Sequence, residues 1–219
     1  MLLTQKPRSA PEVTAPPVLE IRVRGFQVAS APILGAVSLT VAPSETVALV
    51  GPSGVGKTSL LRIIAGLEDR FDGTCAVAGR VAMVFQEPTL LPWCSVQENL
   101  TVTTGITPGQ AKTALAEVGL AGRQDDYPHQ LSLGQQRRLS LARAFAVKPD
   151  LLLMDEPFVS LDPDLVEEMM ALFIKLRASQ TVATLLVTHV ETEAARLADR
   201  IITLGGSPGQ ITRDVANPR

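Results

Sequence analysis

Short runs of apolar residues recur along the chain, each bounded by glycine, proline or charged residues. Four of them are rich in Val, Leu and Ile: Thr46–Val50, Val81–Phe85, Leu151–Met154 and Val182–Val187. Continuous apolar runs of this length are typical of strands buried on both faces of a parallel sheet. None approaches the about 18 uninterrupted apolar residues that a membrane-spanning helix needs. The pattern therefore predicts an α/β fold with a mostly parallel sheet.

Ahead of the first of these runs, apolar and polar residues alternate. The segment Leu19–Arg24 places an apolar residue at every second position, and Val37–Val41 repeats the pattern. Alternation with a period of two predicts half-buried strands, and we expect these two to pair as an N-terminal antiparallel β subdomain. Residues 1–17 contain four prolines and no periodicity, which predicts a flexible tail before a single domain over 18–219.

Between Gln86 and Gln130 the chain has no clear buried strand, and its pattern favours helices. Ser95 can cap a short helix, because Glu98 stands at the capping-box position. A second helix is predicted over Thr107–Val118, and a third follows a serine N-cap at Ser132. These helices predict a helical subdomain, inserted over residues of about 87–146.

Composition adds few constraints. The 219 residues are 46% apolar, which suits one compact domain with a sizeable core. The formal net charge of −2 gives no basic excess, so no nucleic-acid partner is expected. Cys75 and Cys94 do not have the spacing of a metal site; a disulfide between them is possible in principle, but a cytosolic protein would keep both reduced.

A glycine-rich loop lies between the strand Thr46–Val50 and an apolar-faced helix. It matches the phosphate-binding pattern G-x-x-x-x-G-K-[ST]. Its residues are Gly51, Pro52, Ser53, Gly54, Val55, Gly56, Lys57, Thr58 and Ser59. Glycines let backbone N–H groups turn toward an anion, and the helix N-terminus adds a partial positive charge. Lys57 is expected to neutralise the β- and γ-phosphates, and Thr58 to ligate Mg²⁺. The loop thus predicts a site for a nucleoside triphosphate, such as ATP, with Mg²⁺.

Polar residues also follow the other apolar runs. Asp155 and Glu156 come after one strand, while Gln86 and His189 come after two others. Open α/β sheets bind ligands along the edge where parallel strands end, so these side chains are expected to converge there. Asp155 is predicted to hold Mg²⁺, and Glu156 to act as the base that polarises the attacking water. Gln86 is placed to reach the metal or the water, and His189 to hydrogen-bond the γ-phosphate.

With the segments Leu131–Gln135 and Ser160–Asp162, these motifs occur in the order of ATP-binding-cassette (ABC) ATPases. The resemblance extends from about Val18 to Ile211. It implies a P-loop NTPase core carrying an antiparallel β subdomain and an inserted helical subdomain.

The same resemblance implies that two such domains pair head to tail, with ATP between them. A second ABC ATPase subunit is therefore an expected partner, and a homodimer is the simplest arrangement. Ser132, Gly134 and Gln135 would meet the ATP held by the partner chain, and Asp162 would lie at the dimer seam.

A finer resemblance links Val84–Trp93 and Ser207–Ile211 to importer ATPases of the nitrate/sulfonate/taurine type. In such importers a periplasmic solute-binding protein captures the solute and transmembrane permease subunits carry it. The ATPase drives them as a peripheral protein on the cytoplasmic face of the inner membrane. In this family the neighbourhood of Trp93 receives a cytoplasmic helix of the permease, so Trp93 is expected at that interface.

The chain departs from the family pattern in three places. Leu133 stands where the signature has Gly; its side chain must point away from the phosphate, which is expected to slow the closed dimer rather than block it, with a cost of about 1 kcal/mol where the backbone is strained. The β subdomain is short between Gly73 and Phe85. Phe26 falls at a core position and Ser30 near the adenine-stacking position, so base selectivity is expected to be weak.

Three other functions compete with transport. A soluble ABC-type ATPase acting on DNA or ribosomes usually carries two cassettes or long insertions, and this chain has neither. A small-molecule kinase or GTPase would not need Leu131–Gln135, and no Asn-Lys-x-Asp motif is present. A protein that binds without hydrolysing is favoured only by Leu133. The residues that argue against it are the intact Lys57, Asp155, Glu156 and His189. The ATPase of an importer is the predicted function.

Overall fold

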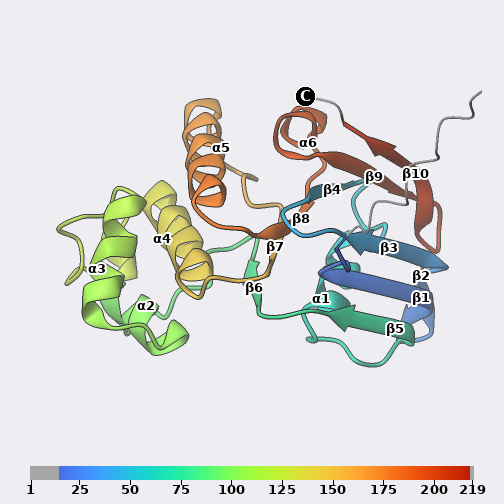
Figure 1. Ribbon diagram of the computed structural model, residues 1–219, viewed down its shortest axis with the longest axis horizontal. Helices are drawn as coiled ribbons and strands as arrows, with labels where there is room; N and C mark the ends of the chain where they lie inside the picture. Colours follow the sequence, from blue (N-terminus) through green and yellow to red (C-terminus); the bar gives the residue numbers. More distant parts are fainter. Residues whose placement is uncertain (1–14, 218–219) are drawn as a thin grey trace, which may run out of the picture.

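Six strands form the main sheet of the structure, a computed structural model that describes residues 15–217 (Figure 1). Their order is β10-β9-β4-β8-β7-β6. Their bounds are β4 (Thr46–Val50), β6 (Val81–Val84), β7 (Leu151–Asp155), β8 (Ala183–Val187), β9 (Arg200–Gly205) and β10 (Gln210–Ala216). All pairs are parallel except β9 with β10. The four apolar runs became β4, β6, β7 and β8, and the predicted α/β class is confirmed.

A second, antiparallel sheet is built around β1. Its strands are β1 (Leu19–Val28), β2 (Ala31–Leu34), β3 (Val37–Val41) and β5 (Asp72–Val77). Ile21 lies opposite Leu39 on β3 and opposite Cys75 on β5, while β2 pairs with the far end of β1. The expected antiparallel pair is confirmed, and β5 is a strand that the sequence pattern did not indicate.

The helices fall into two groups (Figure 1). The first group lies along the main sheet and comprises α1 (Lys57–Ile64), α5 (Pro163–Ala178) and α6 (Glu191–Leu197). The second group lies beyond β6 and comprises α2 (Val96–Thr104), α3 (Pro108–Glu117), α4 (Leu133–Ala146) and the short 3₁₀ helix η1 (Pro128–Gln130). Ser95 caps α2 in a capping box with Glu98, as predicted. Ser132 caps α4 in the same way with Gln135.

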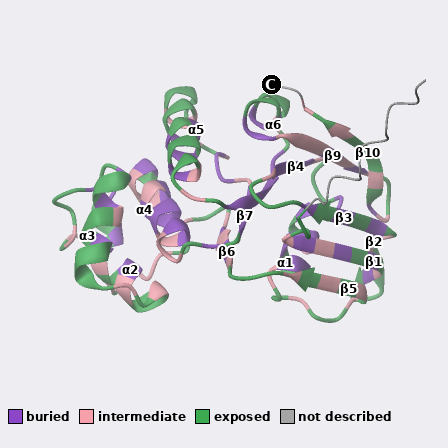
Figure 2. Cartoon of the chain, in the orientation of Figure 1, coloured by how far each residue is buried: buried purple, intermediate pink, exposed green. Residues whose placement is uncertain are grey.

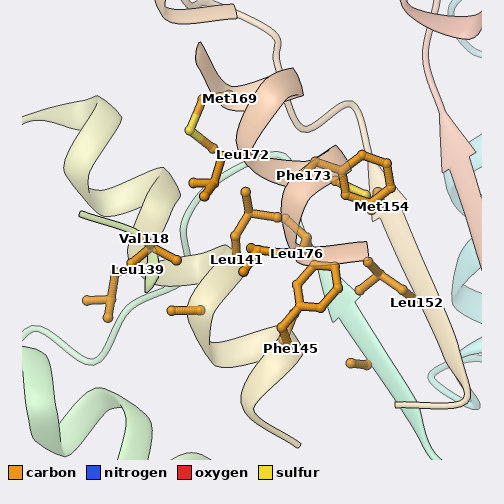
Figure 3. Close-up of a cluster of buried hydrophobic side chains, with 14 of the residues drawn as sticks. Val118, Leu139, Leu141, Phe145, Leu152, Met154, Met169, Leu172, Phe173 and Leu176 are labelled. Atoms are coloured by element: carbon orange, nitrogen blue, oxygen red, sulfur yellow. The ribbon is translucent and has the colours of Figure 1, made fainter. Parts of the chain in front are cut away.

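The two faces of the main sheet bury separate cores, because successive residues of a strand point to opposite faces. On β7, Leu152 and Met154 pack with α4 and α5, whereas Leu151 and Leu153 pack with α1 and the antiparallel sheet. Figure 3 shows the first of these cores, in which Phe145 of α4 lies among side chains of α5 and β7. The strands β7 and β8 are buried along their whole length, while the outer surfaces of α3 and α5 are exposed (Figure 2).

Two predictions from the sequence concern an N-terminal tail and the lack of a membrane-spanning helix. Of the predicted tail over 1–17, residues 1–14 lie outside the described residues, and residues 15–17 are exposed and have no regular secondary structure. Among residues 15–217, no helix is both long enough and apolar enough to cross a membrane.

Candidate functional site

The glycine loop joins β4 to α1 and packs tightly on its surroundings. Gly56, the N-cap of α1, has a φ of 107°. A Cβ on Gly56 would lie 2.5 Å from a methyl group of Leu34, and one on Gly51 would lie 2.3 Å from the carbonyl oxygen of Leu204. Because Gly56 has no side chain to cap α1, the first N–H groups of the helix are left for another acceptor. An anion such as a phosphate supplies that acceptor.

Lys57 is buried at the start of α1. Its Nζ donates hydrogen bonds to the carbonyl oxygens of Gly51 at 2.8 Å and Pro52 at 2.9 Å. An ammonium group has three protons, so one donor remains for a ligand. Burial lowers the pKa of Lys57, and the nearby Glu156 and Asp155 oppose that effect. A cation held in this way suits the phosphates of a nucleotide.

Thr58 and Asp155 meet beside the loop. The Thr58 hydroxyl donates to Oδ1 of Asp155 at 3.1 Å, from the first turn of α1 to the last residue of β7. Asp155 is only 6% exposed, and burial raises the pKa of its carboxyl. Hydroxyl and carboxylate oxygens are ligands that Mg²⁺ accepts. A divalent cation would also offset the cost of burying this charge, so these two residues fit a magnesium site.

Glu156 follows Asp155 in a conformation unusual for a residue with a side chain. Its φ is 44°, in the left-handed region, and its N–H donates to the carbonyl oxygen of Val187 at 3.0 Å. Backbone strain of this kind gathers at active sites. The turn brings Oε2 of Glu156 to 3.4 Å from Nδ1 of His189, which follows β8. The fold thus joins two of the residues predicted to act on the γ-phosphate.

Behind His189 lies a buried polar pair that the sequence patterns did not indicate. The Thr188 hydroxyl donates to Oε2 of Glu193 at 2.5 Å and accepts from the N–H of Val190 at 3.0 Å. These bonds fix Thr188 and Val190, the residues on either side of His189. The only signal in the sequence is an acidic residue on the inward face of the short helix α6.

Gln86 lies at the same edge of the sheet, two residues beyond β6, but its side chain is exposed. Its carbonyl oxygen accepts a hydrogen bond from Arg137 of α4, which also donates to the carbonyl oxygen of Val159 at 3.3 Å. Arg137 is buried, and burial lowers its pKa. Arg137 thus ties α4 to the segments that follow β6 and β7. A charge on the buried side of a helix was the signal that could have identified Arg137.

The predicted signature residues lie at the start of α4, on the other side of β7 from α1 (Figure 1). Within one chain they are therefore not brought to the glycine loop. Ser132 and Gln135 bond each other in the capping box, and Gly134 is buried against Leu165. Asp162 caps α5 by accepting from the N–H of Leu165 at 3.0 Å.

Leu133 is the outward-facing residue at the start of the signature helix. It is the first residue of α4, it has no left-handed φ, and 44% of its surface is exposed. The single chain therefore carries no left-handed backbone strain at Leu133, because the N-terminal turn of a helix accepts any ordinary side chain that points outward.

Comparison with known proteins identifies similar chains. A sequence model of the family described as ABC transporter matches residues 34–159. The aliphatic sulfonates import ATP-binding protein SsuB 2 of Burkholderia cenocepacia is 39% identical, with 94% of this chain and 82% of that protein covered. SsuB of Granulibacter bethesdensis is 44% identical, with 94% and 88% covered. The dimeric, post-hydrolysis structure of the ATP-binding cassette MJ0796 bound to ADP and Pi is similar with a TM-score of 0.79. It is 26% identical, with 92% of this chain and 99% of that chain covered.

Proposed function

Because the chain belongs to the ABC transporter family, as a subunit that binds and hydrolyses ATP, we propose that it powers the uptake of an organic sulfonate. Several relatives are named as ATP-binding proteins for the import of aliphatic sulfonates. The chain works as a dimer with a second ATPase subunit and with a permease in the membrane. The observation that carries the proposed chemistry is the convergence of Lys57, Thr58, Asp155 and Glu156 at the end of β4 and β7.

In this proposal the glycine loop and Lys57 hold the phosphates of ATP. The free N–H groups at the start of α1 face the same anion, and the third proton of Lys57 Nζ reaches it. Thr58 and Asp155 hold Mg²⁺. The ion, when bound, neutralises charge that develops on the β- and γ-phosphates. Ser59 and the other loop residues complete the cradle.

Glu156 acts as the base in the proposed reaction. Its carboxylate accepts a proton from the water that attacks the γ-phosphorus, and its left-handed backbone aims the side chain off the end of β7. His189, 3.4 Å away, donates to the γ-phosphate. Gln86 reaches the metal or the water from the end of β6, after its exposed side chain turns toward the site.

The second half of the site comes from the partner subunit. Ser132, Gly134 and Gln135 lie across the sheet from their own glycine loop, so in this proposal their segment contacts the ATP of the partner. Asp162, at the start of α5, lies at the seam between the two chains. A head-to-tail homodimer would complete two identical sites at once.

Solute selection is assigned to other proteins. We place the chain on the cytoplasmic face of the inner membrane, where the domain over 18–219 contacts the permease through the helical subdomain of about 87–146. A periplasmic solute-binding protein would deliver the sulfonate to the permease. A soluble ABC-type ATPase not coupled to transport is not favoured, because the relatives are import subunits.

Reconstitution tests the proposed function. The chain is assembled in proteoliposomes with its permease and a solute-binding protein, and ATP hydrolysis is measured with an alkanesulfonate, nitrate or sulfate. We expect stimulation by the sulfonate, and none with Lys57→Ala, which cannot hold the phosphates. Stimulation by nitrate alone would reassign the solute, and hydrolysis indifferent to all solutes and to the permease would contradict coupling to import.

A further inference from the structure

The turn between β9 and β10 packs directly on the glycine loop. It contains Gly209, part of the segment Ser207–Ile211 that resembles sulfonate-type importers. A Cβ built on Gly209 would lie 2.1 Å from the carbonyl oxygen of Val55, in the middle of the loop. No real Cβ atom approaches a backbone oxygen so closely. The two backbones therefore touch at a point where no side chain fits.

Space alone requires glycine at this position. The φ of Gly209 is outside the left-handed region, so another residue could adopt its backbone conformation. The turn also cannot move away easily. The N–H of Gly209 donates to the carbonyl oxygen of Ile33 at 2.9 Å, and its own carbonyl oxygen accepts from the N–H of Gly35 at 2.9 Å.

The glycine loop is held by the same elements on its other sides. Gly56 packs on Leu34 of β2, and Gly51 packs on the carbonyl oxygen of Leu204 of β9. The side chain of Val55 is buried beneath the loop. Hence β2, the Leu204 carbonyl of β9 and Gly209 in the turn form a continuous support under the loop, and Gly209 is its point of closest approach.

We propose that Gly209 is a positioning residue for the phosphate loop: its missing side chain lets the β9–β10 turn set the height of the Val55 peptide and the direction of the loop N–H groups. The inference rests on the nucleotide-binding role of the loop. A Cβ at Gly209 must displace Val55, since the hydrogen bonds of Gly209 to Ile33 and Gly35 hold the turn in place. A shift on the order of 1 Å in such a cradle is enough to lose much of its function.

Gly209→Ala tests the proposal, with Gly205→Ala as its matched control. Gly205 ends β9 in the same hairpin, also outside the left-handed region, and a Cβ there would meet only the side chain of Thr212 at 3.1 Å. Dissociation constants for ATP and GTP are measured by calorimetry, well below the unfolding temperature of each variant. Gly209→Ala should weaken both nucleotides by the same factor, about tenfold or more, because the loop contacts phosphates and not the base. Gly205→Ala should stay within about twofold of the wild type.

Amide hydrogen exchange on the wild-type chain gives a second test of the proposal, and this test does not depend on the folding of a variant. ATP should slow amide exchange in residues 205–211 and leave residues 72–77 of β5 unchanged, because a loop fixed by ligand steadies the turn packed on it. Unchanged affinity in folded Gly209→Ala, an equal loss in Gly205→Ala, or no slowing in 205–211 would each overturn the proposal. A wild-type chain that bound no ATP would instead contradict the proposed function.

Discussion

The Nδ1 atom of His189 lies 3.4 Å from the Oε2 atom of Glu156. The two residues follow the neighbouring parallel strands β8 and β7, and the N–H of Glu156 is itself bonded to Val187 on β8. The chain fold alone therefore holds the proposed base beside the residue proposed to contact the γ-phosphate. The signature segment of the same chain lies on the far side of the sheet, away from its own glycine loop. A second chain must therefore supply that part of the site.

Trp93→Ala should spare the isolated chain and impair its assembly with the permease. The Trp93 side chain is 73% exposed, so truncation removes little buried area, and the free energy of unfolding should change by less than about 0.5 kcal/mol. Exposed aromatic residues are common anchors of protein interfaces. Co-purification with the permease and ATPase assays in proteoliposomes measure the loss. Leu67→Ala, at a residue 62% exposed beyond α1, is the control. Normal transport by the Trp93 variant would place the contact elsewhere.

Leu133→Gly should raise steady-state ATPase activity without stabilising the free chain. The Leu133 backbone is unstrained, so any gain must come from closer approach to the phosphate bound by the partner. Glycine costs up to about 1 kcal/mol in a helix relative to alanine, so the unfolding temperature should fall slightly. Turnover at saturating ATP and thermal unfolding separate the two effects. Equal or lower turnover would indicate that the dimer accommodates Leu133 without cost.

GTP should compete with ATP within about tenfold. Phe26 is buried in the core, only 6% exposed, and Ser30 occupies the turn between β1 and β2, so neither offers an aromatic face to a base. Base stacking on an aromatic residue is worth about 1–3 kcal/mol, and 1.4 kcal/mol is one decade in affinity. Competition binding with a fluorescent ATP analogue measures the ratio. A preference for ATP above about a hundredfold would reveal a base contact that these residues do not supply.

Glu193→Gln should stabilise the nucleotide-free chain increasingly as pH rises. Burial raises the pKa of Glu193 above its ordinary value of 4.5, while the bond from Thr188 and the charge of His189 oppose the rise and Glu156 adds to it. A raised carboxyl pKa means that protonation favours the fold. That contribution is complete below the unfolded pKa and is lost as pH rises through the folded pKa. Glutamine keeps an acceptor for Thr188 and never ionises.

Thermal unfolding of Glu193→Gln and the wild type between pH 4 and 8 measures this difference. The advantage of the variant should grow from about pH 4.5 upward and level off above the folded pKa. Glu191→Gln removes an exposed charge from the same helix and serves as the control. A difference that does not change with pH would mean that Glu193 carries no buried charge.

The sequence predicted those parts of the site in which local geometry dictates residue type. Gly51, Lys57 and Thr58 are demanded by one loop around one anion, and Asp155 is marked by the apolar strand before it. The supports behind the site could not be predicted, because they depend on which distant segments pack together. Gly209 touches Val55 only after β9 and β10 fold back on β2.

Two further features, the role of Arg137 and the strand β5, also depend on packing between distant segments and so could not be predicted. Arg137 reads as one more polar residue after the signature, and only the docking of α4 shows that it joins Gln86 to Val159. The strand β5 contains Asp72, Gly73 and Ala76, which are depleted in strands, so its intrinsic preference for a strand is weak and its pairing with β1 stabilises it.

The most direct test of a two-chain ATPase site is Glu156→Gln with ATP. The variant keeps Lys57, Thr58 and Asp155, so it should bind ATP with Mg²⁺. Without a base it should release phosphate at least about a hundredfold more slowly than the wild type. Gel filtration in ATP should then show an accumulated dimer, which is absent for Lys57→Ala because that variant cannot hold the nucleotide. A Glu156→Gln chain that stays monomeric in ATP, or that hydrolyses it at nearly the wild-type rate, would contradict the account.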